Sequence, residues 1–202
     1  MLNPEIKIAK SKGIDIPLLY IYAGGYMSGE KLHETMAWRK FLRNSYKSYD
    51  EDDEGNIVSF PLAILDPYNG GKEFKSIDQK GLTSSLSPNA IYDGDLMSVK
   101  KADIIVANID TFGCDRPMIG TYWELGLADA MGKPFIIIAP DKKAGERLNI
   151  KTGLVEDYTF YDIATKHPFL CRASGIVKSV EQLVSEKHLI IFYRRIAGSI
   201  YE

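Results

Sequence analysis

The chain has 202 residues, 45% of them apolar and 26% charged, and its 25 basic and 27 acidic residues leave a net charge of −2. This length predicts one domain with a full hydrophobic core, and the composition excludes a disordered or collagen-like chain. A nucleic-acid binder usually carries a basic excess, which is absent here. The apolar runs are all shorter than the roughly 20 residues that span a bilayer.

The first ten residues carry three charges, so they do not resemble a signal peptide. Two cysteines occur, Cys114 and Cys171, and without an export signal we expect free thiols in a reducing compartment. These features predict a cytoplasmic protein with neither a membrane nor a nucleic acid as its partner.

Short apolar runs alternate with segments of helical spacing. Strands are expected at residues 16–23, 57–65, 103–109 and 135–139, each followed by a Gly, Asp or Pro break. Helices are expected at residues 28–46, capped by Ser28, at 89–101, and at 120–131, ended by Gly132. We expect an exposed acidic loop at residues 50–55. We also expect a long loop at residues 68–88, and loops of that length are usually functional or mobile.

Beyond Pro140 the pattern weakens. Residues 155–160 are a candidate fifth strand, and residues 179–196 a final helix, although 189–193 fit a strand equally well. Apolar strands that alternate with helices predict a doubly wound α/β domain with a parallel sheet of about five strands. Ligands bind such sheets beyond the carboxyl ends of the strands, which places the candidate site at residues 23–29, 66–71, 109–124 and after Pro140.

The first motif in these loops is the glycine turn, residues 23–29 (AGGYMSG). Glycines let backbone N–H groups approach a ligand, and a following helix N-terminus favours anions. The turn matches neither the G-x-G-x-x-G nor the P-loop pattern. A tight turn without a ligand is therefore an equal alternative.

The second motif is residues 120–128 (GTYWELGLA). Thr121 and Glu124 have the spacing of a capping box, in which Glu124 satisfies a backbone N–H. The same first-turn position would also stabilise Glu124 as an ionised nucleophile facing the ligand crevice. The residues alone leave both interpretations open.

Four aspartates lie close to these motifs: Asp95 and Asp103 flank a helix-to-strand junction, and Asp110 and Asp115 precede Glu124. Each is also typical of a turn. The histidines are scattered and the two cysteines are far apart, which argues against a metal site. The G-x-S-x-G elbow of serine hydrolases is absent, which argues against that class of enzyme. Carboxylates around one rim favour chemistry that carboxylates perform unaided, of which glycoside cleavage is the leading example.

The order of these motifs resembles that of the nucleoside 2-deoxyribosyltransferases and the related deoxynucleoside 5′-monophosphate N-glycosidases. The resemblance covers residues 16–140 and includes Ala-Gly-Gly-Tyr-Met, Leu65-Asp66-Pro67, and Asp95-x7-Asp103 followed by a strand. Its most specific part is Gly-Thr-x-Trp-Glu-x-Gly-x-Ala-x4-Lys-Pro, which begins at Gly120 and ends at Pro134.

The resemblance implies a flavodoxin-like fold, no cofactor, and exchange of the base on a 2′-deoxynucleoside. It implies that Glu124 attacks C1′ of the sugar, that Asp103 handles the proton of the base, and that Tyr22, or its neighbour Tyr20, hydrogen-bonds the nucleophile. The residues expected to contact substrate are Gly24, Gly25, Tyr26, Met27, Asp66, Asp95, Asp115, Met118, Gly120 and Thr121.

The chain departs from the family where the sugar hydroxyls or a phosphate are held. Many transferases have Asp six residues before the nucleophile, and the glycosidases often have Ser; here Met118 occupies that position, and Asp115 is a candidate replacement. The chain is also longer than most members. Segment 141–202 does not match the family pattern. In transferases of this family the C-terminal segment often completes the site of a neighbouring copy, and here Asn149 and the tail Tyr201-Glu202 are candidates for that role.

The resulting hypothesis is N-deoxyribosyl transfer by a retaining double displacement through a glycosyl–Glu124 intermediate, in a homo-oligomer of one domain per chain. Two alternatives stay open. The first is hydrolysis of the N-glycosidic bond of a nucleoside or nucleoside 5′-monophosphate. The second is a nucleotide sensor that binds in the same pocket without turnover.

Overall fold

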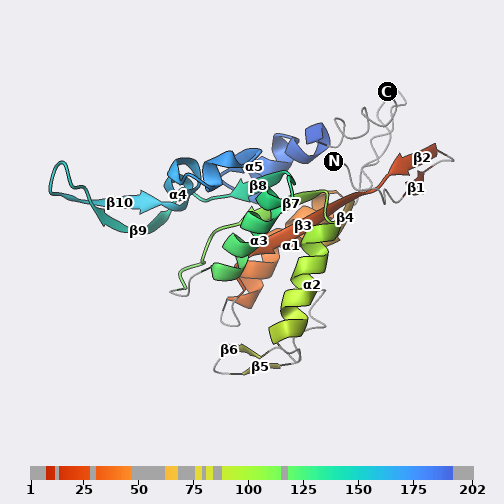
Figure 1. Ribbon diagram of the computed structural model, residues 1–202, viewed down its shortest axis with the longest axis horizontal. Helices are drawn as coiled ribbons and strands as arrows, with labels where there is room; N and C mark the ends of the chain where they lie inside the picture. Colours follow the sequence, from red (N-terminus) through yellow and green to blue (C-terminus); the bar gives the residue numbers. More distant parts are fainter. Residues whose placement is uncertain are drawn as a thin grey trace.

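The computed structural model describes residues 8–11, 14–27, 31–46, 62–67, 76–78, 81–83, 88–114 and 118–192. A central sheet of five parallel strands has the order β11-β8-β7-β3-β4 (Figure 1). Its strands are β3 (Leu19–Gly25), β4 (Leu62–Leu65), β7 (Ile104–Asn108), β8 (Phe135–Ile138) and β11 (Gly175–Val177). Read from β4, the chain order is 2-1-3-4-5, which is the flavodoxin-like order. The predicted fold class is confirmed.

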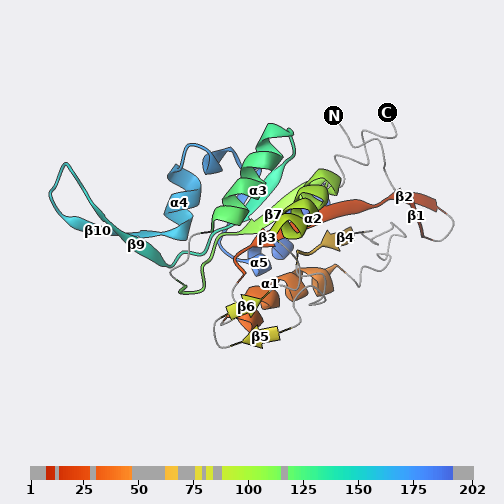
Figure 2. The same ribbon diagram turned by 60° about the horizontal axis from the view of Figure 1, so that its bottom comes forward.

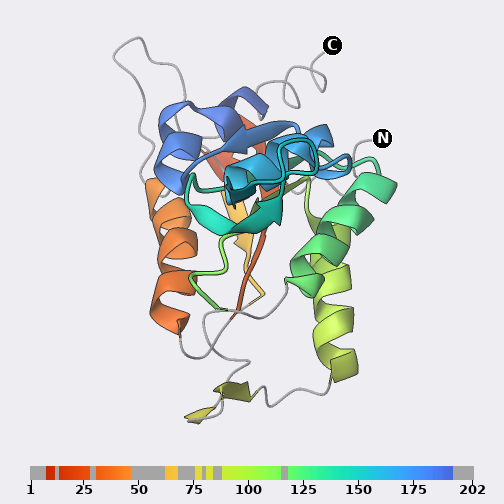
Figure 3. The same cartoon turned by 90° about the vertical axis from the view of Figure 1, so that its left-hand side faces the viewer.

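Helices cover both faces of the sheet, as Figure 3 shows nearly end-on. Helix α1 (Leu32–Ser45) packs with α5 (Val180–Ser185) on one face, and α2 (Pro88–Lys101) packs with α3 (Ile119–Ala130) on the other. Successive strand residues point to opposite faces. Ile21 and Ile104 therefore belong to the core under α1 and α5, while Tyr22 and Ile105 belong to the core under α3.

The prediction that residues 155–160 supply the fifth strand of the central sheet is wrong. They form β10 (Val155–Thr159), which pairs antiparallel with β9 (Lys143–Leu148) in a two-stranded ribbon. The ribbon projects away from the sheet (Figures 1 and 2). The fifth strand is β11, which has only three residues, too few for a periodic pattern to mark it.

The C-terminal part continues from the ribbon into α4 (Phe160–Lys166) and the 3-10 helix η2 (Leu170–Arg172). Helix α5 ends at Ser185, and the chain turns at Lys187, whose φ is 56°. Residues 188–192 are again helical, so the strand alternative for this segment is wrong over its described part.

The other elements are two antiparallel pairs, β1 (Ile8–Ser11) with β2 (Ile14–Pro17) and β5 (Ser76–Asp78) with β6 (Gly81–Thr83). The cap expected at Ser28, the loop at 50–55 and most of segment 68–88 lie outside the described residues. Among the helices that are described, none is long and apolar enough to cross a membrane.

The chain reverses strand order between β3 and β7, which are neighbours in the sheet. This is the topological switch point at which doubly wound sheets bind ligands. Strand β3 ends there in Gly24-Gly25, and the chain leaving β7 leads into α3, which carries Glu124.

Candidate active site

Glu124 lies in the second turn of α3, because the helix begins at Ile119 after the N-cap Met118. This N-cap makes no side-chain hydrogen bond, and Thr121 is a buried residue inside the helix. The capping-box interpretation is therefore wrong, and so is the expectation of a first-turn carboxylate. Glu124 is only 7% exposed and points into the protein.

Three elements converge on the Glu124 carboxyl group. The Tyr22 hydroxyl, from β3, donates a hydrogen bond of 2.7 Å to Glu124 Oε1. The same hydroxyl lies 3.3 Å from Oδ1 of Asp95, which α2 supplies. Tyr22 thus connects two carboxyl groups. Glu124 Oε2 is buried and has no hydrogen-bond partner within the part of the chain that the structure describes.

This environment favours a protonated pair. Burial raises the pKa of Glu124 to about 7; the Tyr22 hydrogen bond opposes the rise, the Asp95 charge adds to it, and Arg39 opposes it. Burial also raises the pKa of Asp95, against the hydrogen bond from Tyr22. The tyrosine keeps its proton, since burial and the Glu124 charge hold the pKa of Tyr22 well above its usual value. The pair therefore retains a proton close to neutral pH.

The glycine turn passes directly beneath Glu124. A Cβ on Gly24 would come within 2.8 Å of Glu124 Oε2 and 3.2 Å of the Tyr22 ring. Gly25 has a φ of +153°, and a Cβ there would come within 2.9 Å of the Asn108 carbonyl oxygen. Both glycines are thus required by close approach.

A pocket of about 290 Å³ opens beside this group. Glu124 and Asp95 supply its carboxyl groups, and its other walls are mainly apolar. The complete lining is Gly25, Tyr26, Met27, Pro67, Ile91, Asp95, Met118, Ile119, Gly120, Thr121 and Glu124. Seven predicted substrate contacts (Gly25, Tyr26, Met27, Asp95, Met118, Gly120 and Thr121) therefore meet around one cavity.

Asp103 lies at the amino end of β7, away from the carboxyl ends of the strands where the pocket opens. Its Oδ2 accepts a hydrogen bond of 2.8 Å from the Tyr20 backbone N–H. Gly24 pairs with Ala107, four residues after Asp103, which corresponds to about 13 Å along a strand. Although burial raises the pKa of Asp103 too, the structure does not bring this carboxyl to Glu124. The carboxyl that accompanies Glu124 is that of Asp95.

Asp66 also faces away from the pocket. It lies within an ion-pair distance of two arginines of α1, 3.6 Å from Arg39 Nε and 3.1 Å from Arg43 Nη2. The charge of Arg39 acts on Glu124. The sequence analysis did not single out this residue, because a lone arginine inside a helix carries no local signal. Asp115 lies outside the described residues.

No group of three or more His, Cys, Asp and Glu side chains within the described ranges is arranged to hold a metal ion.

Asp110 is a turn residue: its Oδ1 accepts a hydrogen bond from the Phe112 N–H, and its Oδ2 pairs with Lys142.

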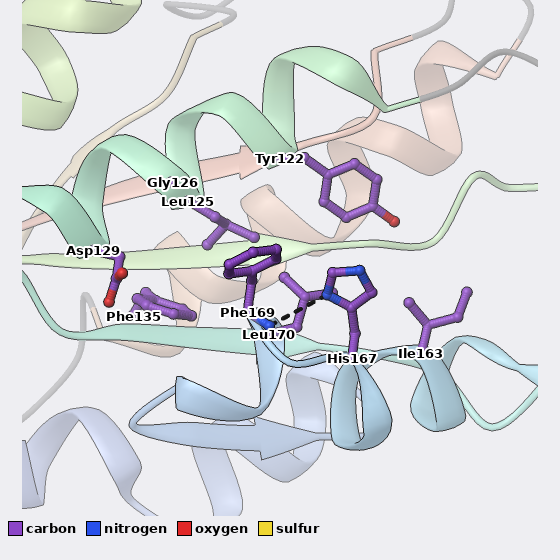
Figure 4. A pocket seen from close by; sticks show the side chains of 9 residues that line it. All are labelled: Tyr122, Leu125, Gly126, Asp129, Phe135, Ile163, His167, Phe169 and Leu170. Carbon is purple, nitrogen blue, oxygen red and sulfur yellow. Dashed lines mark hydrogen bonds between the residues drawn. The ribbon is translucent and has the colours of Figure 1, made fainter.

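A larger cavity of about 500 Å³ lies on the other side of α3, between this helix and α4–η2 (Figure 4). Phe135, Ile163, Phe169 and other apolar side chains dominate its lining, and Asp129 is the single carboxylate among the lining residues. Despite its size, this cavity lacks a carboxyl pair, so the smaller pocket beside Glu124 is the better candidate for catalysis.

The family model described as nucleoside 2-deoxyribosyltransferase matches residues 43–159. This is more than half of the chain, which therefore belongs to the nucleoside 2-deoxyribosyltransferase family. A search of curated proteins found no match.

Two similar solved structures support the same fold. One is a conserved protein from Enterococcus faecalis V583, with a TM-score of 0.50 and 18% identity over 85% of this chain and 98% of the other. The second is a 2-desoxiribosyltransferase from Leishmania mexicana, with a TM-score of 0.52 and 17% identity over 84% of this chain and 96% of the other.

The substitution Gly24→Ala tests the close approach beneath Glu124. We expect at least a tenfold loss of turnover, because the added methyl displaces Glu124 Oε2 and the Tyr22 ring. Gly126→Ala is the matched control, because a Cβ at Gly126 would meet no neighbouring side chain or other segment within 4 Å. In an exposed helix, Ala is more favourable than Gly by about 0.8–1 kcal/mol. Steady-state rates and thermal melts measure both. Equal rates in the two variants would contradict the proposed crowding.

Glu124→Gln tests the buried carboxyl through protein stability. Because the folded pKa is raised, Glu124 disfavours folding only where the unfolded chain is ionised. The wild-type free energy of unfolding should fall between pH 4.5 and about 7 relative to the variant. The rise of the Glu124 pKa corresponds to a loss of roughly 3 kcal/mol in the free energy of unfolding across this pH range.

Chemical denaturation at pH 4, 6 and 8 measures the difference between the two proteins. Asp93→Asn removes an exposed carboxyl of the same domain and should leave the difference constant to about 0.5 kcal/mol. A difference for Glu124→Gln that does not grow with pH would show that folding does not raise the pKa of Glu124.

Proposed function

We propose that the protein transfers a 2-deoxyribosyl group between nucleobases through a covalent intermediate on Glu124. The observation that carries the proposal is the Tyr22 hydroxyl, which joins the Glu124 and Asp95 carboxyls at one pocket. A nucleophile and a proton donor must act on the same bond, and these two carboxyls are close enough to do so.

In the first step, Glu124 attacks C1′ of the sugar as an ionised carboxylate. The C1′–N bond breaks, its electron pair stays on the base nitrogen, and the base takes a proton from Asp95. The oxocarbenium-like transition state is stabilised by the adjacent carboxylate. Tyr22 orients Glu124 by donating to Oε1, and Glu124 lines the pocket that would hold the sugar.

In the second step, a different base attacks C1′ of the glycosyl ester. Its nitrogen loses a proton to Asp95, and Glu124 leaves as a carboxylate, so atoms and charges balance. Two inversions retain the anomeric configuration. The mainly apolar walls, including Met27, Met118 and Ile119, are suited to the planar base.

The assay that tests this proposal incubates the protein with a 2′-deoxynucleoside and a different free base. We expect the exchanged nucleoside from the wild type and a loss of at least 10³-fold in Glu124→Gln, which keeps the size of the side chain but not the nucleophile. Product analysis separates the alternatives. Free deoxyribose without exchange would indicate a hydrolase, and binding without turnover would indicate a sensor.

Asp95→Asn tests the proton donor, with Asp103→Asn as its matched control. General acid catalysis contributes about 10² to 10⁴ in rate, so Asp95→Asn should lose that factor with natural bases. A sugar with a nitrophenolate leaving group should lose far less, because that group departs without a proton. Asp103→Asn should keep most of its turnover. The opposite order of the two variants would return the proton-transfer role to Asp103.

The pH dependence of kcat/KM checks the same assignment. The reactive state carries one proton on the carboxyl pair, located on Asp95. Burial raises the pKa of both carboxyls, so wild-type kcat/KM should fall at alkaline pH, where the pair loses its last proton. In Asp95→Asn only the ionisation of Glu124 matters, and the residual activity should rise with pH. A falling alkaline limb in that variant would contradict Asp95 as the donor.

We further infer that the chain acts as a homo-oligomer of single domains. Support comes from the β9–β10 ribbon, where Leu148, Ile150, Leu154 and Val155 are 63%, 93%, 65% and 65% exposed. An isolated two-stranded ribbon is marginally stable in water, and burying each such side chain contributes about 1.5–3 kcal/mol. A second copy of the chain would provide that cover.

Light scattering on the eluting protein measures this. We expect a mass that is a multiple of 22.6 kDa, and a shift towards the monomer in Ile150→Asp. Thr152→Asp places the same charge two residues away on a polar side chain and should leave the mass unchanged. A monomeric wild type would contradict the inference.

A further inference from the structure

Arg39 of α1 lies beneath the glycine turn, on the face of the sheet opposite Glu124. Its side chain is 1% exposed. Its Nε donates to the Ala23 carbonyl oxygen at 3.0 Å, and its Nη2 donates to the Gly25 carbonyl oxygen at 3.2 Å. A third donor, Nη1, bonds the Thr35 carbonyl oxygen of its own helix at 2.6 Å.

These two carbonyls face the edge of β3 on which β4 lies. The Tyr20 carbonyl accepts from the Asp103 N–H on the β7 side, so carbonyls of odd-numbered residues point the other way. Strand β4 pairs with β3 only as far as Tyr22 opposite Leu65. Beyond that point the Arg39 guanidinium takes the position of a strand partner and bonds Ala23 and Gly25 together.

Gly24 is the residue between the two bonded carbonyls, and it is also the residue that lies against Glu124 and Tyr22. A guanidinium presents its donors in a rigid planar fork, so it fixes both carbonyls at once. Asp66, at the end of β4, lies 3.6 Å from Arg39 Nε and balances its charge. The side chain of Arg39 thus fixes the backbone on both sides of Gly24, the residue that lies against the Glu124 carboxyl.

We propose that Arg39 is a positioning residue of the Glu124 site, which holds the Gly24 backbone in place and thereby keeps the Glu124 carboxyl aimed at the pocket. The proposal rests on the function proposed above. Arg39 is not among the described residues that line the pocket, and it bonds the turn from the face of the sheet opposite Glu124, so it acts through the turn. A displacement of about 1 Å at a reacting group costs up to about 10²-fold in rate.

The charge of Arg39 also reaches Glu124. Tyr22 from β3 and Asp95 from α2 lie beside Glu124, and Arg39 acts on it from the other face of the sheet. Arg39 is the cation among these three groups, and its charge lowers the pKa of Glu124 against the effect of burial. Removal of Arg39 should therefore move both the aim of the carboxyl and its titration, whereas a merely structural residue would move neither in a folded protein.

The test compares Arg39→Met and Arg39→Lys with Arg43→Met in the full chain. Arg43 bonds the other oxygen of Asp66, but its side chain is 38% exposed and, among the described residues, it does not bond the turn. Two measurements are made: kcat and KM for base exchange, and the titration of the Glu124 carboxyl by carbon NMR, assigned with Glu124→Gln.

We expect Arg39→Met to lower kcat about 10- to 100-fold with KM within a few-fold, and to move the Glu124 titration to higher pH. Arg39→Lys should keep the titration near that of the wild type, since its charge remains, but should still lower kcat, since one ammonium group cannot hold both carbonyls as a fork. Arg43→Met should leave both measurements unchanged.

A folded Arg39→Met with wild-type kcat and titration would overturn the proposal, as would equal losses in Arg39→Met and Arg43→Met. If Arg39→Met does not fold, Arg39→Lys decides, and wild-type kcat in that variant overturns the fork. A wild type without exchange activity would reject the proposed function alone, because the NMR titration still measures the effect of Arg39 on Glu124.

Discussion

The hydrogen bond from Tyr22 to Glu124 is the interaction on which the site depends. It joins β3, one of the two strands at the switch point, to α3, the helix that follows β7, across 102 residues of sequence. The bond forms only because β3 turns Tyr22 toward α3 and Gly24 leaves space beside the carboxyl. Asp95 from α2 then meets the same hydroxyl, so the packing of two helices on one strand assembles the carboxyl pair.

A buried carboxyl destabilises the fold once it is ionised, and the structure shows how that cost is moderated. Tyr22 donates to one oxygen and the Arg39 charge acts from below, while the other oxygen is left without a bond among the described residues. A carboxylate with little water around it can stabilise a developing positive charge without reorganising solvent. The feature that weakens folding is therefore the one that suits glycosyl chemistry.

Helix α3 separates two cavities of different character. One side carries Thr121 and Glu124 into the pocket, and the other presents Tyr122, Leu125 and Asp129 to the larger apolar cavity. The Lys-Pro that ends the family motif has a structural role: Lys133 donates to the Lys100 carbonyl at 2.7 Å and to that of Ala102. It thereby caps the end of α2, the helix that carries Asp95. The motif thus contains both reactive and supporting residues.

The sequence by itself determined the parallel α/β domain and the glycine turn, because periodicity and short motifs report local structure. Glu124 was favoured as the nucleophile only through the resemblance to the family. The sequence could not distinguish Asp95 from Asp103, eight residues apart, because only the tertiary structure shows that Asp103 bonds the Tyr20 backbone just before β7 whereas Asp95 reaches the Tyr22 hydroxyl beside Glu124. Likewise Arg39, the three-residue β11 and the second-turn position of Glu124 depend on contacts between distant segments. The tertiary structure decided these, since a side chain acquires its partners only when the sheet has closed around it.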